Sequence, residues 1–425
     1  MVVRVNKKQT STLSLLASLT CFLSVSAQAT STNDLPPSKS ERFEQALKAR
    51  TEGKTYQAIE LLEELVEQNP SHARLQLELA KSYYQAHQYQ LAEATVEDVL
   101  QDTSSSETAR NKSQQFLNRI NEKKVKFDSQ RHSFKGSIKM FTGNDTNANA
   151  APADNDLEEG ILPISSISQE DTFIGASISL KHRYQFSGSY NIADKPATLS
   201  WLNSLKVSDK NYDDIDRSDL TVTTINTGLT LSQKRNWNTG IKLRGEHIRL
   251  GGENLAYYTS IIPSYTHFFD KASVSLTPRY TRRDYVDSND KGKEGHRSSI
   301  TLAYTHPFDY DITLRLAVDA ATTDLEDDWR SYDTSKFSLR VLKKFTPELS
   351  LSFSSSYEDK QYDSFAPSYS EDRHDKTTRA GLGLKYKLTP AIVLGLKYSY
   401  TDRDSNQEIR VYDRERLEAS IGYNF

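Results

Sequence analysis

The part of the chain after Lys126 is dominated by segments in which apolar and polar residues alternate with a period of two. Ile174, Ile178 and Leu180, for example, share one face of such a segment. Because successive side chains of a strand point to opposite faces of its sheet, this alternation predicts strands with one apolar and one polar face. We count fourteen candidate strands, at about residues 133–142, 173–186, 197–208, 218–233, 237–250, 256–269, 272–284, 296–307, 311–323, 333–345, 348–358, 376–388, 391–402 and 412–425.

The links between these candidate strands differ in length by a simple rule. Every second link is a tight turn, such as Thr346-Pro347, and most links between the turns are long and charged, such as Asp359 to Asp375. Only the link from Ser187 to Pro196 is longer than this rule predicts. Short turns at one end and long loops at the other are typical of transmembrane β-barrels. The pattern favours an antiparallel barrel over residues 131–425, and disfavours a soluble β-sandwich, in which link length need not follow such a rule.

The segment that ends at Phe425 predicts which solvent each face of the barrel meets. Leu417, Ile421, Tyr423 and Phe425 fall on one face of this strand, and polar residues fall on the other. An apolar face with a terminal aromatic residue is similar to the assembly signal of outer-membrane barrels. We therefore expect Tyr423 and Phe425 to engage the barrel assembly machinery, with lipid outside the barrel and water inside it. An even number of strands would place both ends of the barrel chain in the periplasm.

The start of the chain predicts a secretory signal peptide over residues 1–29. Basic residues precede an apolar stretch from Leu13 to Val25, and Ala27-Gln28-Ala29 is a small-residue cleavage pattern. Cleavage there would remove Cys21, the single cysteine, and with it any disulfide or cysteine-based metal site. Lipidation of Cys21 is the less favoured alternative, since no small residue precedes it. Residues 30–39 are polar and are predicted to form a linker.

Residues 40–127 have a helical pattern that repeats at an offset of 34 residues. Ala46 aligns with Ala80, and Ala58 aligns with Ala92. This period, with small residues where paired helices meet, looks like the tetratricopeptide repeat. The predicted fold class is thus α+β multidomain: a short all-α helical domain in the periplasm, followed by a fourteen-stranded transmembrane barrel. Because two repeats are few for independent stability, we expect the helical domain to pack against the barrel or against a partner.

The geometry of such repeats would direct one set of side chains toward a concave groove. We expect this groove to bind a substrate, and the alternative is a plain helical spacer without a ligand. The candidate groove residues are Phe43, Leu47, Arg50, Arg74, Leu77, Lys81 and Tyr84.

The sequence contains no convincing catalytic or cofactor-binding motif, such as a nucleophile elbow, a phosphate-binding loop or a dinucleotide fingerprint. A net charge of -3 gives no broad basic field for nucleic acid. Asp145, Asn147 and Asn149 have the spacing of a calcium loop, but Ala150 replaces its turn glycine. We therefore expect no enzymatic activity, cofactor, metal or nucleic-acid partner.

Two stretches of the predicted barrel carry a family resemblance. One is the D-x-N-x-N-A run at Asp145, Asn147 and Asn149, and the other is the closing segment from Tyr398 to Phe425. Both resemble the barrel domain of the surface lipoprotein assembly modifiers (Slam), although the helical domain here is shorter than that family implies. The matching residues of the closing segment are Tyr398, Tyr400, Ser405, Asn406, Tyr412, Asp413, Arg414, Arg416 and Phe425.

The resemblance implies a translocon in the outer membrane of a Gram-negative bacterium. Its partners would be membrane lipid and a cargo, either a lipoprotein or a small secreted protein, carried from the periplasm to the cell surface. The alternative hypothesis is a passive porin or an exopolysaccharide-export channel.

Overall fold

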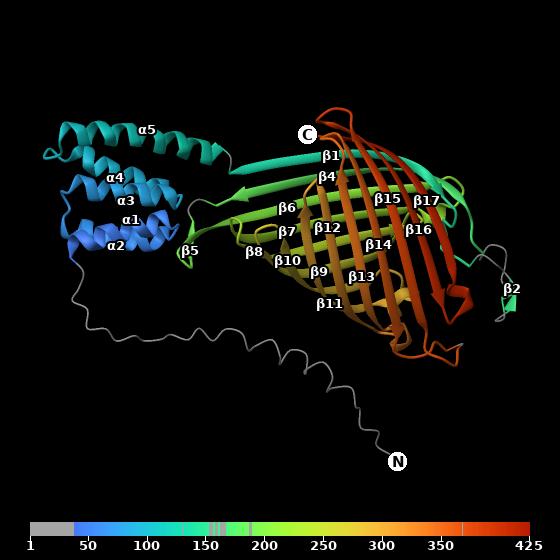
Figure 1. Ribbon diagram of the computed structural model, residues 1–425. Helices are drawn as coiled ribbons and strands as arrows, with labels where there is room; N and C mark the ends of the chain where they lie inside the picture. The colour runs from blue at the N-terminus through green and yellow to red at the C-terminus, as the bar shows by residue number, and fades with distance from the viewer. Residues whose placement is uncertain are drawn as a thin grey trace, which may run out of the picture.

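A computed structural model of the protein describes residues 38–129, 131–152, 156–157, 160–161, 167–186, 189–367 and 369–425. Within these ranges, a helical domain precedes a closed β-barrel, as the sequence predicts (Figure 1). The predicted signal peptide, and the predicted linker up to residue 37, lie outside the described residues. None of the helices described has the length and apolar character needed to span a membrane.

The helical domain packs around small residues, at the positions that the 34-residue offset predicts. Ala46, Ala58, Ala80 and Ala92 are all fully buried, because they lie where successive helices approach most closely. The first helix begins at a capping box, in which the Ser38 side chain accepts a hydrogen bond from a backbone N–H of the first turn. The helices are α1 (Lys39–Thr51), α2 (Thr55–Gln68), α3 (Ala73–Gln85), α4 (Tyr89–Gln101) and α5 (Glu107–Ser129).

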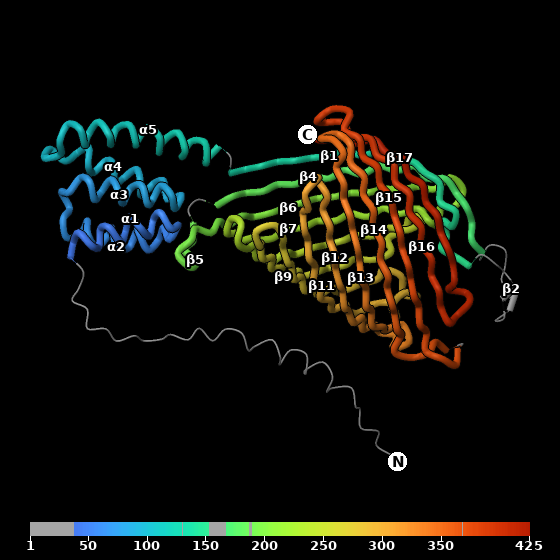
Figure 2. The backbone as a smooth tube through the Cα atoms, viewed as in Figure 1, coloured from blue at the N-terminus to red at the C-terminus, as the bar shows by residue number. Residues whose placement is uncertain are grey.

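The barrel contains the fourteen predicted strands, joined in sequence order by antiparallel pairing. The first strand also pairs with the last, so the sheet closes on itself and keeps no free edge (Figure 2). The strands are β1 (His132–Asp145), β4 (Asp171–Gln185), β6 (Lys195–Tyr212), β7 (Leu220–Gln233), β8 (Trp237–Leu250), β9 (Glu253–Phe268), β10 (Ser273–Tyr285), β11 (Gly295–Phe308), β12 (Ile312–Leu325), β13 (Tyr332–Lys344), β14 (Leu349–Tyr362), β15 (His374–Lys387), β16 (Ile392–Ser405) and β17 (Tyr412–Asn424).

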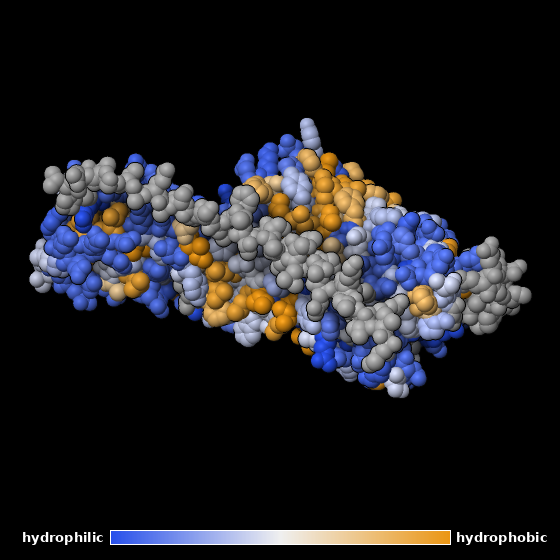
Figure 3. Space-filling view, turned by 90° about the horizontal axis from the view of Figure 1, so that it is seen from below, coloured by the Kyte–Doolittle hydropathy of each residue, from blue (hydrophilic) through white to orange (hydrophobic). Residues whose placement is uncertain are grey.

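The apolar residues of these strands cover the outside of the barrel. Leu302 on β11 and Ile421 on β17, for example, are each 51% exposed. So many exposed apolar side chains would be unfavourable if they faced water. Figure 3 shows apolar side chains over the middle of the barrel surface, between hydrophilic regions at the helical domain and at the far end. This band fits a lipid-facing wall.

The links follow the predicted rule with one departure at each end of the barrel. On the side of the long links, β8 and β9 are joined by Gly251-Gly252 alone, and both glycines have positive φ. Such a two-residue hairpin needs this backbone conformation, which glycine adopts without steric cost. Several other long links contain a short 3₁₀ turn, as at Asp216–Ser218 and Glu408–Arg410.

The unusually long link from Ser187 to Pro196 has a structural role. It contains the short strand β5 (Tyr190–Ile192), which pairs with the start of β6. The hydroxyl groups of Tyr56 on α2 and Ser189 lie 2.6 Å apart, and Ser189 also donates a hydrogen bond to the Ala86 carbonyl oxygen. The helical domain therefore contacts the barrel at its short-turn end. Residues 187–188 of this link lie outside the described part.

The first long link contains a separate two-stranded sheet. It is formed by β2 (Asp156–Leu157) and β3 (Gly160–Ile161), which pair antiparallel to each other.

Candidate functional site

The predicted groove residues lie on α1 and α3, the first helices of the two repeats, and several of them meet. Arg74 lies over the ring of Phe43, with 5.1 Å between its guanidinium carbon and the ring centroid. Arg50 and Lys81 each form an ion pair at 2.6 Å with Glu78. Glu78 was not among the predicted residues, although its i, i+3 spacing from Lys81 is a signal for it.

The other predicted groove residues contribute to packing. Leu47 and Leu77 are half-buried. The Tyr84 ring lies 5.6 Å from the rings of both Tyr89 and Phe116, so it helps to hold α4 and α5 against α3. The cations of α3 are exposed, and they are the groove side chains most available to a ligand.

Asp145, from the predicted first-link motif, forms a buried polar cluster where the barrel closes. Its carboxylate accepts hydrogen bonds from Arg414 at 2.5 and 2.6 Å, from Arg416 at 3.1 Å and from the Tyr212 hydroxyl at 2.7 Å. Its side chain is fully buried. The structure thus brings together residues from both stretches that carry the family resemblance, and one carboxylate joins β1, β6 and β17.

The two asparagines of the same motif fix the path of the first long link. Asn147 donates a hydrogen bond to the Asp413 carbonyl oxygen at 3.1 Å, in the closing hairpin. Asn149 donates to the Ile167 carbonyl oxygen at 2.7 Å and accepts from the Gln169 backbone N–H at 3.0 Å. Both amides therefore bind protein groups. Among the residues that the structure describes, no group of three or more His, Cys, Asp or Glu side chains could hold a metal ion.

Tyr423 and Phe425, the predicted assembly signal, lie on the outer face at the short-turn end of the seam. Their rings are stacked at 6.1 Å, and both are more than half exposed. Phe425 and Gly136 exchange two backbone hydrogen bonds, at 2.7 and 3.0 Å. The Phe425 ring covers Gly136 so closely that a Cβ atom there would lie 2.3 Å from it, so a larger residue at this position on β1 would displace the ring.

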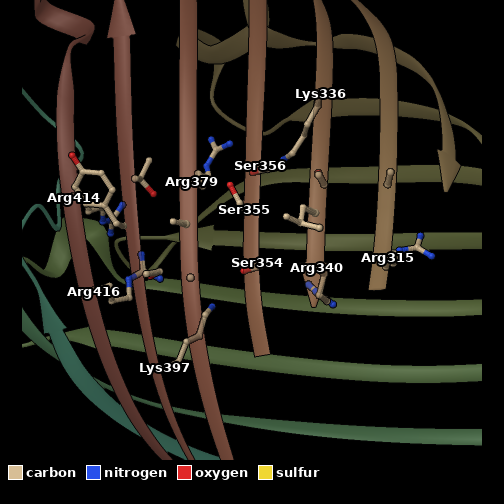
Figure 4. A pocket seen from close by; sticks show the side chains of 18 residues that line it. Arg315, Lys336, Arg340, Ser354, Ser355, Ser356, Arg379, Lys397, Arg414 and Arg416 are labelled. Atoms are coloured by element: carbon tan, nitrogen blue, oxygen red, sulfur yellow. The ribbon is translucent and has the colours of Figure 1, made fainter. Parts of the chain in front are cut away.

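The inner surface of the barrel carries a feature that the sequence analysis missed. A cavity of about 480 Å³ in the lumen is lined by seven basic residues from β12 to β17, and no Asp or Glu is among the described residues that line it. We call these seven residues the basic wall (Figure 4). They are Arg315, Lys336, Arg340, Arg379, Lys397, Arg414 and Arg416.

The alternation of the strands explains why these cations face inward. Lys397 lies between Leu396 and Tyr398, which are 48% and 38% exposed on the outer face of β16. Because neighbouring residues of a strand point to opposite faces, Lys397 must face the lumen. Arg315, Lys336, Arg340 and Arg379 occupy the same inward phase of their own strands. Counting the charges on the inward phase of each strand would have revealed the basic wall.

Part of the basic wall is neutralised by acidic neighbours. Lys336 and Arg379 lie 3.4 and 3.7 Å from the carboxylate of Glu358. Arg414 and Arg416 bind Asp145, as described above. Within the described residues, no ion pair involves the other three members, Arg315, Arg340 and Lys397.

Positive charge continues along the lumen toward the short-turn end. A second cavity, of about 610 Å³, is lined there by Lys135, Lys181, Arg183 and Lys242. A third, of about 410 Å³, is lined by Lys139, Lys344, Lys385 and Lys387, with Glu348 as its acidic residue. The whole chain has a net charge of -3, so the linings of these three cavities are opposite in charge to the molecule as a whole. Acidic residues gather instead in the long links, as at Glu326-Asp327-Asp328.

Comparisons with known proteins find similar families for parts of both domains. Residues 49–111 match the family model of the tetratricopeptide repeat, and residues 276–425 match the model described as "Putative beta-barrel porin 2". No curated protein has a sequence that matches the chain significantly.

Several solved outer-membrane barrels align with this chain at low identity. Outer-membrane expressed OmpT of Vibrio cholerae has 9% identity and a TM-score of 0.41, over 69% of this chain and 97% of that one. An anion-selective porin from Comamonas acidovorans has 10% identity and a TM-score of 0.39, over 69% and 99%. A bacterial polysaccharide outer membrane secretin has 8% identity and a TM-score of 0.38, over 68% and 98%. The chain therefore joins a helical domain similar to tetratricopeptide repeats to a closed fourteen-stranded β-barrel, whose second half is similar to a porin family.

Proposed function

We propose that this protein is an outer-membrane export conduit, in which the helical domain receives a cargo in the periplasm and the barrel passes it outward. The observation that carries the proposal is the contact between the two domains. Tyr56 on α2 and the Ala86 carbonyl both meet Ser189 in the link between β4 and β6, so the repeats stand at the short-turn mouth of the barrel. In barrels of this type, the short turns face the periplasm.

The first candidate cargo is a lipoprotein or a small secreted protein. It is supported by the resemblance of the closing segment and the first-link motif to the Slam family. The groove on α1 and α3 suits an extended polypeptide, because it presents the half-buried ring of Phe43 beside the exposed cation of Arg74. Aromatic and arginine side chains are the residues that most often dominate protein interfaces.

The second candidate is an exopolysaccharide-export channel or a passive porin. One observation favours it, namely the basic wall with its neighbouring hydroxyl groups, such as Ser354, Ser356 and Ser399. Charged and hydroxyl groups can bind a hydrophilic polymer or small solutes, and they offer little to an apolar polypeptide segment.

The proposal is tested by the surface exposure of the cargo in a strain that lacks this protein. For a protein cargo, we expect normal synthesis but protection from external protease, and the complete chain should restore exposure. A charge-reversed groove, Arg74→Glu with Lys81→Glu, should restore it poorly although the barrel is unchanged. Glu97→Lys with Glu107→Lys, an exposed pair outside the groove, is the matched control.

The outcomes separate the candidate cargoes. Loss of a surface polysaccharide with all surface proteins retained would favour the second candidate. An unchanged cell surface, with only small-solute permeability altered, would reject export and leave a porin.

A further inference from the structure

We propose that the basic wall is a carboxylate-binding site that makes the lumen select for anions. The inference rests on the second candidate of the proposed function, the polysaccharide-export channel, and deepens it by naming the charge of what the conduit carries. Its basis is the three cations, Arg315, Arg340 and Lys397, for which the described residues supply no ion pair although they share one cavity.

Acidic residues near the cavity are engaged by other cations. Glu418, which lies opposite Lys397 on the neighbouring strand, forms an ion pair at 2.6 Å with Lys139. Asp145 binds two arginines at the seam, and Glu358 is shared between Lys336 and Arg379. Asp319 lies 3.6 Å from Arg297 and accepts a hydrogen bond from Thr301 at 2.6 Å. The three unpaired cations therefore present their positive charge to the cavity. The low dielectric of the cavity walls concentrates their electric field there.

The geometry of the wall matches carboxylate chemistry. Arg315, Arg340 and Lys397 come from three different strands, β12, β13 and β16, and face one space (Figure 4). Guanidinium groups offer paired N–H donors that fit the two oxygens of a carboxylate.

Two sources could supply such carboxylates, a free small acid or the repeated acid groups of a polymer. The structure favours a polymer, because basic residues also line the cavities nearer the short-turn mouth, including Lys135, Lys181 and Lys385. A single small ligand needs one site, whereas a chain of acid groups can contact the whole path. Hydroxyl side chains beside the cations favour an acidic polysaccharide over an acidic polypeptide.

The test is ion selectivity of the full chain in a planar bilayer with a potassium chloride gradient. We expect the reversal potential of an anion-selective channel. Replacing all three cations (Arg315→Gln, Arg340→Gln, Lys397→Gln) should lower the permeability ratio of chloride to potassium about tenfold, since field focusing of this kind raises local ion concentration by about that factor or more. The conservative set Arg315→Lys, Arg340→Lys and Lys397→Arg should keep the selectivity.

Arg282→Gln is the matched control. Arg282 lies on β10, two residues after the outward-facing Tyr280, and is 71% exposed in an ion pair with Asp284. The substitution removes one positive charge outside the lumen, so the selectivity of this variant should equal that of the unchanged protein. Cation selectivity, or equal effects of this control and the triple variant, overturns the inference.

Block of the current by different ligands then identifies the source of the carboxylate. We expect polygalacturonate oligomers to block the current at concentrations at least about tenfold below those of monomeric galacturonate, because many acid groups bind one path. Neutral dextran should not block. Block by the monomer alone would reject the polymer, and equally tight block by polyglutamate would reject the preference for a sugar chain.

A channel that is closed in the bilayer is tested by calorimetric titration of polygalacturonate into the full chain in detergent. Binding that the triple variant loses supports the inference, and absence of binding overturns it. Neither result depends on the surface-exposure assay, so failure of the inference and failure of the export function are distinguishable.

Discussion

Asp145 links three strands at the seam where β1 pairs with β17. Its fully buried carboxylate accepts hydrogen bonds from Arg414, Arg416 and Tyr212, which come from strands far apart in sequence. In sequence, the D-x-N-x-N-A run and the closing segment both resemble parts of one family. The sequence could not indicate that they touch, because their contact depends on the register in which Asp145 faces Arg416 across the seam.

We predict that Asp145→Asn destabilises the barrel. The substitution leaves two arginines without their carboxylate, and breaking a largely buried ion pair of this kind costs about 3 kcal/mol. The measurement is the temperature at which the folded band is lost in heat-modifiability gels. Asp284→Asn is the control, since its pair with Arg282 is exposed and should contribute little. Equal melting of both variants would contradict the role given to Asp145.

The helices and strands were predictable to different degrees. All fourteen strands form, because alternation reports directly on the two faces of a sheet. Several strands run farther outward than predicted, as β14 does to Tyr362 and β16 to Ser405. Beyond the membrane the outer face no longer needs apolar residues, so the alternation stops before the hairpin does. In the helical domain, the 34-residue period was enough to predict the repeats. The ion pair between Arg50 and Glu78 could not be predicted, because it depends on how α1 and α3 pack.

The ion pairs of Glu78 predict a pH dependence of the helical domain. Burial alone would raise the pKa of Glu78, but hydrogen bonds from Lys81 and Arg50 outweigh it and hold the pKa below its usual value. A carboxyl with a depressed pKa in the folded state stabilises that state above its unfolded pKa of about 4.3. This stability is lost as the pH falls through the folded pKa.

We therefore expect the melting temperature of the helical domain to decrease as the pH is lowered below about 4.3. Circular dichroism of the full chain follows this transition. Glu78→Gln should melt earlier at neutral pH and should lack this part of the acid dependence. Glu60→Gln, at an exposed site on α2, should behave like the unchanged protein. An unaltered acid profile in Glu78→Gln would count against the prediction.

At the scale of the whole molecule, charge is sorted by surface. Cations gather inside the barrel, whereas acidic residues are frequent in the long links. The net charge of -3 does not reveal this separation, because a sum over the chain does not report which side chains face the lumen. The arrangement also gives the molecule two unlike ends, one with the helical domain and short turns and the other with the long links (Figure 1).

The export account depends above all on which end faces the cell exterior. Single cysteines test this directly, because the chain has only Cys21, within the predicted signal peptide. A membrane-impermeant maleimide should label Ser364→Cys, in the link between β14 and β15, on intact cells. It should label Glu348→Cys, in the turn between β13 and β14, and Gln85→Cys, in the helical domain, only after the outer membrane is opened. Labelling of Glu348→Cys and Gln85→Cys on intact cells, with Ser364→Cys protected, would contradict the account.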